Sequence, residues 1–342
     1  MKTLNNSEVS LMESLVSVGQ KSLQAILYNF LKKNYEKVTF DESFIIAEGD
    51  IPIALLAHMD TVFQKPVEEL FYDRQKNVMW SPQGMGADDR AGIYAIIQIV
   101  KAGYRPHIIF TTDEEIGAIG AQELALYPCP FKDLRYMIQL DRRNSNDCVF
   151  YDCDNEEFEK YVESFGFVAA YGSFTDICEL CPSWGIAGVN LSIGYRDEHS
   201  KTEILFVGQM LATIEKVKKM LSAENIPNFK FIPIAAAYSY YNWYGKNSYL
   251  DDYDYYNTPF DFQSLPKNTV RYKCHCCGKA FSEDEVLDVQ LIRGGKGYFC
   301  CDCLVDHVDW CAKCGQAFEI DPKDPHSKFC KTCKKIIRKK SK

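Results

Sequence analysis

The sequence predicts an α/β protein, a three-layer α/β/α sandwich around a mostly parallel mixed sheet, followed by a small cysteine-rich module. Two observations predict this architecture. Short apolar runs, typical of strands buried on both faces, alternate with longer segments of helical periodicity. Ten of the 15 cysteines lie between Cys274 and Cys333, near the C-terminal end of the 342 residues.

The predicted elements begin with an amphipathic helix at residues 11–31, where apolar side chains recur at helical spacing. Buried strands are expected at four apolar runs, Ile51–Ala57, Ile108–Thr111, Tyr136–Leu140 and Val189–Ile193. Further helices are expected between and after these strands, at Ala91–Ala102, Glu156–Phe165 and Val207–Leu221. This alternation predicts a mostly parallel sheet with helices on both of its faces.

The composition, 46% apolar and 25% charged residues, is ordinary for a globular protein. The sequence has no run of about 18 apolar residues that could span a bilayer. Residues 1–10 are polar where a secretory signal would be apolar. We therefore expect a cytoplasmic protein without a membrane partner.

The chain is expected to divide into a catalytic domain at residues 1–225, a linker at 226–270 and a cysteine-rich module at 271–342. The last part holds 15 Lys+Arg against 10 Asp+Glu, whereas the remainder holds 24 against 37, so the two parts are expected to face different partners. The linker carries eight tyrosines between Tyr238 and Tyr256 without a regular period. We expect it to drape over one of the domains, the alternative being an aromatic surface that binds a partner.

Potential metal ligands follow each of the four apolar runs. The four ligand-bearing segments contain His58-Met59-Asp60, Asp113-Glu114-Glu115, Asp141 and His199. A fifth segment, Gly84–Gly92, places Asp88 and Asp89 at the start of a predicted helix. In open α/β sheets, binding sites lie outside the carboxyl ends of the strands, where we expect these side chains to gather.

These five segments, in this order, resemble the superfamily of zinc exopeptidases with two neighbouring metals. That superfamily includes peptidase T, carboxypeptidase G-type enzymes, succinyl-diaminopimelate desuccinylase and lidless bacterial aminopeptidases. The resemblance covers residues 7–225. Each segment alone is a common pattern, whereas five in register after predicted strands are specific. The resemblance implies hydrolysis of an amide bond.

The resemblance also implies a ligand set. Asp88 would bridge two cations held ~3.5–4 Å apart. His58 and Asp141 would complete the shell of one cation, and Glu115 and His199 that of the other. One nitrogen and two carboxylate ligands for each cation favour two catalytic Zn²⁺, although Co²⁺ or Mn²⁺ could occupy such a site.

If Glu115 is a ligand, Glu114 is free to act as the general base on a water shared by the two metals. Such a water has its pKa lowered from 15.7 toward ~7, so a bridging hydroxide is available at neutral pH. Both glutamates must lie on a bend, because adjacent residues on an ideal strand face opposite ways. Asp60 is expected to accept the second imidazole N–H of His58 and fix its tautomer, the alternative being a capping aspartate.

Three further carboxylates, Asp89, Asp176 and Glu203, resemble semi-conserved positions of the superfamily. They are expected either to support the ligands or to be ordinary surface and capping groups. His107 lies outside every motif and is expected to be structural.

The sequence departs from many relatives in length. Only 57 residues separate Asp141 from His199, which leaves no room for the lid domain that many relatives insert there. A single catalytic core without a lid is therefore expected. Arg90 stands where the family usually has Lys, which keeps the charge.

Four Cys-x-x-Cys pairs occupy the C-terminal part, Cys274/Cys277, Cys300/Cys303, Cys311/Cys314 and Cys330/Cys333. In a chain without a predicted secretory signal, this spacing indicates thiolate metal ligands rather than disulfides. The pairs resemble two successive zinc ribbons, the first pair with the second and the third with the fourth, each holding one structural Zn²⁺. A cross-braced arrangement, first pair with third, is the alternative. Cys276, Cys301 and His307 are alternative ligands.

The predicted function is that of a metallo-exopeptidase, an aminopeptidase acting on short peptides. An N-acyl amino acid deacylase is an alternative, because the same metal site serves both reactions on an acylated small molecule. A catalytically inactive zinc-ribbon interaction protein is the alternative outside the enzymes. The basic C-terminal end, residues 334–340, could contact nucleic acid or an acidic protein partner, or it could be a solvated tail.

Overall fold

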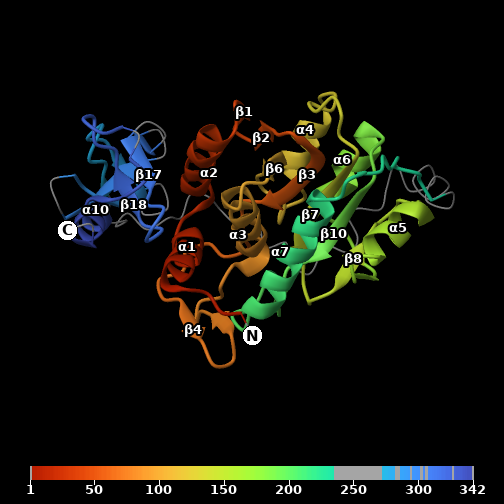
Figure 1. The fold of residues 1–342 in the computed structure, drawn as a ribbon, viewed down its shortest axis with the longest axis horizontal. Helices are drawn as coiled ribbons and strands as arrows, with labels where there is room; N and C mark the ends of the chain where they lie inside the picture. The colour runs from red at the N-terminus through yellow and green to blue at the C-terminus, as the bar shows by residue number, and fades with distance from the viewer. Residues whose placement is uncertain are drawn as a thin grey trace, which may run out of the picture.

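The structure is a computed structural model that describes residues 2–234 and 272–340, apart from 282–285, 293–294, 301–302, 305–306 and 326. The predicted tyrosine-rich stretch lies outside these residues. The helices are α1 (Asn6–Val16), α2 (Gln20–Asn34), α3 (Ala87–Lys101), α4 (Ile119–Ala125), α5 (Glu156–Glu163), α6 (Ile177–Trp184), α7 (Val207–Leu221) and α10 (Lys331–Lys340). Figure 1 shows their arrangement.

The central sheet has eight strands in the order β1-β2-β6-β3-β7-β10-β8-β9. Their bounds are β1 Lys37–Phe40, β2 Phe44–Glu48, β3 Ile51–His58, β6 Pro106–Thr111, β7 Tyr136–Arg142, β8 Asp147–Val149, β9 Val168–Ala169 and β10 Gly188–Ser192. The four central strands β6, β3, β7 and β10 are parallel to their neighbours within this group. These are the four predicted strands, so the predicted mixed α/β sheet is confirmed.

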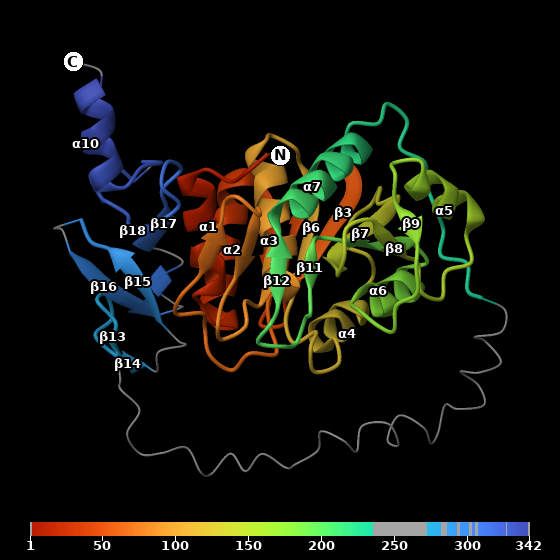
Figure 2. The same ribbon diagram turned by 90° about the horizontal axis from the view of Figure 1, so that it is seen from below.

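Strand β3 shows why the sheet has helices on both faces. Leu55 and Ala57 belong to the apolar cluster that contains α1, α2, α3 and α7. Ala54 and Leu56, which point the other way because side chains alternate along a strand, pack with residues of α4 and α6. Every residue from Ile53 to His58 is buried. The resulting three layers are visible in Figure 2.

A second, antiparallel sheet of four strands carries the last predicted metal ligand. Its strands are β4 (Phe71–Asp73), β5 (Val78–Trp80), β11 (Tyr195–Arg196) and β12 (Ile204–Phe206), in the order β11-β12-β5-β4. The hairpin between β11 and β12 holds His199 and Glu203. It directs both residues toward the carboxyl edge of the central sheet, where they contact Asp88.

The prediction of one opening helix at residues 11–31 was wrong, because two helices, α1 and α2, occupy this region. The backbone N–H and the hydroxyl of Ser17 both donate to the Glu13 carbonyl and end α1. Gly19 then adopts an extended conformation before α2 begins. Apolar periodicity continues across the break, so the pattern alone did not reveal it. The Val18 carbonyl faces inward and accepts a hydrogen bond from Arg90.

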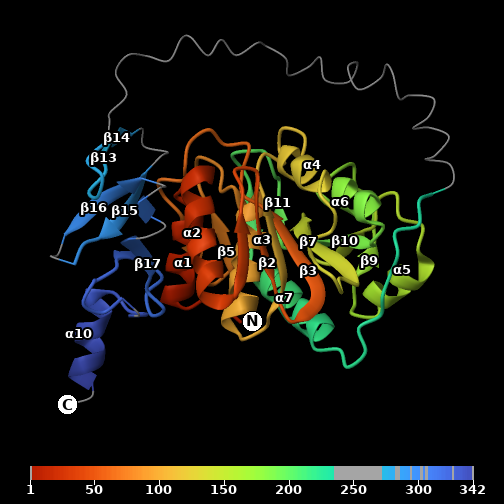
Figure 3. The same ribbon diagram turned by 90° about the horizontal axis from the view of Figure 1, so that it is seen from above.

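The cysteine-rich part packs against α1 and α2 (Figure 3). Its strands are β13 (Tyr272–Lys273), β14 (Ala280–Phe281), β15 (Val286–Gln290), β16 (Lys296–Cys300), β17 (Val308–Trp310) and β18 (Ala317–Glu319). Asn29 of α2 donates from its side-chain amide to the Leu304 carbonyl at 2.8 Å, and Lys33 pairs with Asp309. Apolar residues from β15, β16 and β17 belong to the same buried cluster as α1 and α2. The two parts therefore share one continuous packed interface.

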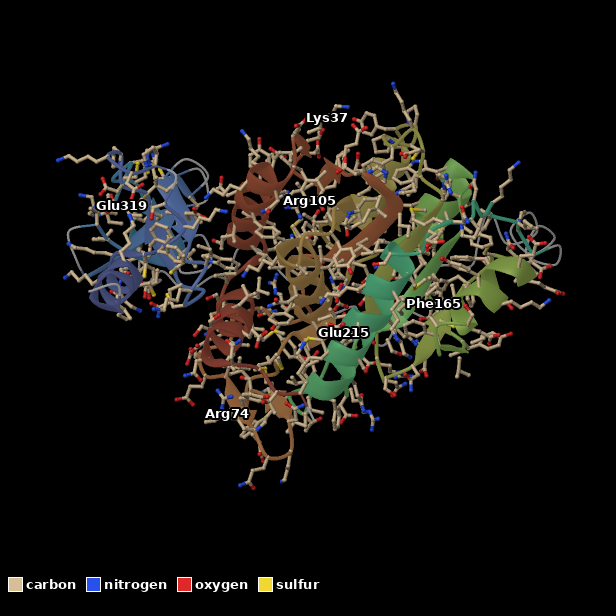
Figure 4. The ribbon with its side chains drawn as sticks, viewed as in Figure 1. Lys37, Arg74, Arg105, Phe165, Glu215 and Glu319 are labelled. Atoms are coloured by element: carbon tan, nitrogen blue, oxygen red, sulfur yellow. The ribbon has the colours of Figure 1, made fainter. Side chains whose placement is uncertain are left out.

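Arg105 and residues 226–234 connect elements of the part of the chain that carries the site. Arg105, labelled in Figure 4, joins the end of α2 to the end of α3 by donating to the carbonyls of Asn34 and Val100. Phe229 is buried, and Lys230 forms a β-bridge with Ile186, so residues 226–234 run along the catalytic part. Among the described residues, no helix is long and apolar enough to cross a membrane.

Candidate metal centre

The carboxyl edge of the sheet gathers the predicted ligands into two groups that share one aspartate. One group is His58, Asp88 and Asp141, and the other is Asp88, Glu115 and His199. Within each group, the potential ligand atoms lie within 4.8 Å of one another. His58 ends β3, Asp141 lies near the end of β7, and Glu115 follows β6.

Asp88 lies between the two histidines. Its Oδ1 is 3.1 Å from Nε2 of His58, and its Oδ2 is 3.3 Å from Nε2 of His199. The two oxygens of one carboxylate thus face opposite imidazoles, as a bridging ligand requires. The backbone N–H of Asp88 donates to Oε1 of Glu203 at 3.1 Å. Glu203 is buried, so it is not a surface group, and by accepting this N–H it holds the backbone of Asp88.

Asp60 connects His58 to the turn that carries the two glutamates. Its Oδ1 lies 3.1 Å from Nδ1 of His58 and accepts the backbone N–H of Glu114 at 3.0 Å. Its Oδ2 accepts the backbone N–H of Glu115, also at 3.0 Å. This arrangement leaves Nε2 of His58 free to face Asp88 and Asp141. One carboxylate therefore orients both a ligand and the bend that the Glu-Glu pair requires.

Glu114 faces the first histidine without contacting it closely. Its Oε2 is 4.0 Å from Nε2 of His58, and burial raises its pKa to about 10, against the lowering effect of His58. Glu115 approaches the other histidine, with Oε2 2.9 Å from Nε2 of His199. Its second oxygen, Oε1, is buried without a hydrogen-bond partner. The two glutamates thus reach different parts of the centre, and Glu115 retains a free ligand atom.

Asp89 and Arg90 lie behind the ligands. Asp89 is fully buried and accepts the backbone N–H groups of Gly92 and His58. Burial raises its pKa well above the usual value, and the nearby Asp141 adds to this effect. Arg90 donates to the carbonyls of Met59 and Val18. Both residues fix the backbone around the ligands.

Sequence reasoning assigned no role to two residues that hold Asp141. The Thr175 hydroxyl donates to Oδ2 of Asp141 at 2.8 Å, and the Tyr195 hydroxyl donates to its Oδ1 at 3.1 Å. Asp176 is fully buried, where its Oδ2 accepts from Thr111 and Gln139. Thr175 directly precedes Asp176, and Tyr195 lies four residues before His199, but the sequence shows no periodicity that aims their hydroxyl groups at Asp141.

Several acidic side chains are buried close together, and this crowding of negative charge, which a bound cation would relieve, shifts their pKa values. Burial and the neighbouring Asp88 raise the pKa of Asp141 to about 7, and burial raises that of Glu203 to about 7. Hydrogen bonds to Asp88 and Glu115 raise the pKa of His199 to about 11. Imidazole nitrogen and carboxylate oxygen are ligands that zinc prefers. Oε1 of Glu115, which has no hydrogen-bond partner, is available as a further ligand atom. The donor set therefore fits divalent cations.

The centre is open on one side. The His199 side chain is 52% exposed, whereas those of His58, Asp88, Glu115 and Asp141 are 1–10% exposed. His199 has a positive φ of 61°, and so has its hairpin neighbour Asp197 at 57°. The hairpin thus turns this imidazole over the edge of the buried cluster, where solvent reaches it.

His107 lies away from the metal centre, as predicted. Its ring stacks on Phe131, and its Nδ1 accepts the backbone N–H of Gly49. Burial lowers its pKa. These contacts are those of a structural histidine.

The cysteine pairs form two further groups. The first unites Cys274, Cys277, Cys300 and Cys303, and the second unites Cys311, Cys314, Cys330 and Cys333. Successive pairs therefore meet, rather than the first with the third. Cys276 and His307 are exposed and belong to neither group, and Cys301 lies outside the described residues. Burial raises the pKa of the Cys274 thiol, but surrounding backbone N–H groups outweigh this and lower it to about 6, which favours a thiolate ligand.

The sequence matches peptidase family M20/M25/M40 over residues 54–316. The chain belongs to this peptidase family. The matched segment includes all the ligand-bearing residues from His58 to His199. An M20/M25/M40 peptidase is a metal-dependent hydrolase, which agrees with the two ligand groups described above.

Two solved structures resemble this peptidase in fold. A tripeptidase from Staphylococcus aureus has a TM-score of 0.50 and 14% identity, covering 63% of this chain and 97% of its own. A TET aminopeptidase from a marine sediment archaeon of the Thaumarchaeota also has a TM-score of 0.50 and 14% identity, covering 64% and 98%. No curated protein matches the sequence. At these identities the likeness to the solved structures shows the fold.

Proposed function

We propose that this M20/M25/M40 peptidase is an aminopeptidase-type exopeptidase with two catalytic divalent cations, zinc by preference. The observation that supports this most directly is Asp88, whose two oxygens face His58 and His199 at 3.1 and 3.3 Å. Asp88 would hold both cations, His58 and Asp141 would bind one of them, and Glu115 and His199 would bind the other.

When bound, the two cations would lower the pKa of a shared water and polarise the scissile carbonyl. Burial raises the pKa of Glu114 when no cation is present, but beside two positive charges this carboxyl would be ionised, so that Glu114 accepts a proton as the water oxygen adds to the carbonyl carbon. As the C–N bond breaks, Glu114 passes that proton to the leaving amine. Asp60 keeps His58 in one tautomer and holds the Glu114 turn through two backbone N–H groups.

An exopeptidase acting on short peptides agrees with the named activities of the structural neighbours, a tripeptidase and an aminopeptidase. The segment between Asp141 and His199 forms β8, α5, β9, α6 and β10 of the core itself. No separate lid is inserted there, which leaves the exposed His199 accessible to a peptide end. The proposed substrate is a peptide whose end lies beside this exposed imidazole.

We assign the units as proposed from the sequence: residues 1–225 catalytic, 226–270 linker and 271–342 a double zinc ribbon with two structural Zn²⁺. Four thiolates around zinc form a closed site that stabilises a fold rather than reacting. Because clustered thiolates persist in reducing compartments, we place the protein in the cytoplasm. The ribbon is expected to need its zinc for folding, since it is small.

The experiment that tests the catalytic assignment compares two substitutions in the full chain. Glu114→Gln keeps all ligands and should retain metal while lowering turnover by about 10²–10⁴-fold. Asp88→Asn should lose catalytic metal as well as turnover. Metal is measured by plasma mass spectrometry, and turnover by product release from aminoacyl, carboxy-terminal and N-acyl amide substrates. Full activity in either variant would refute the assignment, and cleavage of only N-acyl amides would replace the peptidase by a deacylase.

A further inference from the structure

The two histidines of the metal centre are held in different ways. Nδ1 of His58 faces Asp60 at 3.1 Å, and the His58 side chain is 1% exposed. The His199 side chain is 52% exposed, and its polar contacts among the described residues are those of Nε2 with Asp88 and Glu115. A metal-binding histidine almost always donates its second ring N–H to a neighbouring group, which fixes the ring. Because the described part of the chain gives His199 no such group, its position depends on the backbone that carries it.

That backbone is the tip of the hairpin between β11 and β12, residues 197–202. Within the tip, hydrogen bonds run between its own residues. Apart from the contacts of His199 itself, one polar contact joins the tip to a described residue outside the hairpin. It is the ion pair between Nη1 of Arg143 and Oε1 of Glu198, at 2.8 Å. Glu198 directly precedes His199, so this ion pair acts on the backbone next to the imidazole.

The backbone around Arg143 is held by hydrogen bonds from both sheets. Arg143 directly follows β7, the strand that carries Asp141, and its carbonyl accepts the Ser192 hydroxyl of β10 at 2.6 Å. The next residue, Asn144, donates its backbone N–H to the Tyr195 carbonyl of β11 at 2.9 Å. The guanidinium that reaches the tip thus starts from a well-anchored part of the chain.

We propose that Arg143 is a positioning residue, which keeps the imidazole of His199 at the metal centre by holding Glu198. The inference rests on the proposed function, in which His199 binds one of the two cations. Loss of the ion pair should therefore weaken the binding of the cation on the His199 side. The cation on the His58 side should be unaffected, because His58 is held by Asp60 and not by the hairpin tip.

The direction of the effect separates positioning from the charge of Arg143. A guanidinium near the centre repels cations, so the loss of its charge alone would strengthen the binding of both cations. Loss of positioning has the opposite direction and acts on one cation only. The Arg143 and Glu198 side chains are 51% and 21% exposed, and an ion pair so accessible to water is weak. We therefore expect the affinity for that one cation to fall by about fivefold.

The test titrates Co²⁺ into the full chain after a mild chelator has emptied the catalytic centre. Cobalt bound by thiolates has a sulfur-to-metal absorption band, whereas cobalt bound by imidazole and carboxylate has d–d bands alone, so the spectrum separates the cysteine groups from the centre. The unmodified protein should bind two cobalt ions at the centre. Arg143→Met should bind one of them as before and the other about fivefold more weakly. Arg143→Lys, which restores the positive charge, should recover most of this loss.

Lys37→Met is the matched control, because Lys37 pairs with Glu48 at the same distance, 2.8 Å, and both residues lie outside the two ligand groups. Its two cobalt affinities should equal those of the unmodified protein. Unchanged or tighter binding of both ions by Arg143→Met, or equal weakening of both, overturns the positioning role and leaves the peptidase assignment intact. If the unmodified protein binds no cobalt at the centre, the proposed function itself is refuted.

Discussion

At the scale of single residues, the centre depends on carboxylates whose orientation is fixed by neighbours. Asp141 accepts hydrogen bonds from Thr175 and Tyr195, and Asp60 accepts from two consecutive backbone N–H groups. Such supporting contacts typically change metal affinity or activity by about 10–100-fold when lost. The proposed ligands are thus only part of what makes this edge of the sheet a metal site.

Tyr195→Phe removes the hydroxyl that donates to Oδ1 of Asp141. We expect kcat/KM to fall by about 10-fold, because the carboxylate gains freedom to rotate. Tyr136→Phe is the control, since Tyr136 is equally buried but its hydroxyl faces Tyr161. Steady-state kinetics and metal content of both variants check this. Equal activity of the two variants would show that the Tyr195 contact has no catalytic consequence.

At the scale of elements, the break between α1 and α2 has a functional consequence. It places Gln20 at the start of α2, where the side-chain amide donates to Oδ1 of Asp113 at 2.8 Å and accepts its backbone N–H at 3.1 Å. Asp113 has a positive φ of 56°, so this turn is held in a conformation unusual for a residue with a side chain. A helix outside the sheet therefore helps to shape the turn that carries Glu114, the proposed general base, and Glu115, the proposed ligand.

Gln20→Met, which keeps the length of the side chain, should lower kcat by about tenfold with metal content unchanged. The physical reason is that Glu114, once its turn is released, would sample positions from which it cannot accept the proton of the attacking water. Gln122→Met on α4 is the comparison, because Gln122 is also bonded near this turn but to the Gly117 carbonyl, beyond the glutamates. Rapid-quench kinetics with a chromogenic peptide distinguish the two. Identical losses in both variants would contradict a specific role for Gln20.

The glycines that follow two of the cysteine pairs show how closely the ribbon packs on α1. Gly278 and Gly315 occupy equivalent places after a cysteine pair, with φ of 72° and 77°. A Cβ on Gly315 would meet the Leu11 N and Ser7 O atoms of α1 at 3.2 Å, whereas one on Gly278 would meet only the Lys273 side chain at 3.7 Å. Gly315 thus permits the close approach of the ribbon to α1.

Gly315→Ala should therefore destabilise the protein more than Gly278→Ala. Both variants lose about 1 kcal/mol or more from the positive φ, and the first adds crowding against α1. Differential scanning calorimetry with zinc present measures the unfolding midpoints, and limited proteolysis reports release of the ribbon. If both alanine variants unfold at the same temperature, the packing of Gly315 on α1 contributes nothing to stability.

At the scale of the whole molecule, the buried carboxylates of the metal centre lower the stability of the fold when no cation is bound to them. Burial raises the pKa of Asp141 and of Glu203 to about 7. Between roughly pH 4.5 and 7, the folded protein therefore holds more protons at these groups than the unfolded chain does. The free energy of unfolding of the metal-free protein consequently falls as the pH rises through this range.

We expect the free energy of unfolding of the chelated protein to decrease from pH 5 to pH 7, by up to about 1.4 kcal/mol per pH unit for each such group. Asp141→Asn should show a shallower decrease, because it has one titrating group fewer. Chelation empties the ribbon equally in both proteins, so the difference reports on the catalytic edge. Urea unfolding at several pH values provides the measurement, and parallel curves for the two proteins would contradict the expectation.

Much of the architecture was predictable because its signals are local. The strands β3, β6, β7 and β10 are continuous apolar runs, since both of their faces are buried. Helix α7 begins and ends at the predicted residues Val207 and Leu221. The short strands of the second sheet, the break after α1 and helix α6 with its internal Pro182 lack such periodicity, so they were not predicted.

By itself, the sequence determined the α/β fold class, the ligand-bearing segments and the four cysteine pairs, because strand burial and motif spacing are properties of adjacent residues. Only the tertiary structure decided that Asp88 faces both histidines, that successive cysteine pairs meet, and that the ribbon packs on α1 and α2. These arrangements depend on how distant segments cross and pack, and no local pattern encodes the direction in which a hydroxyl such as that of Tyr195 points.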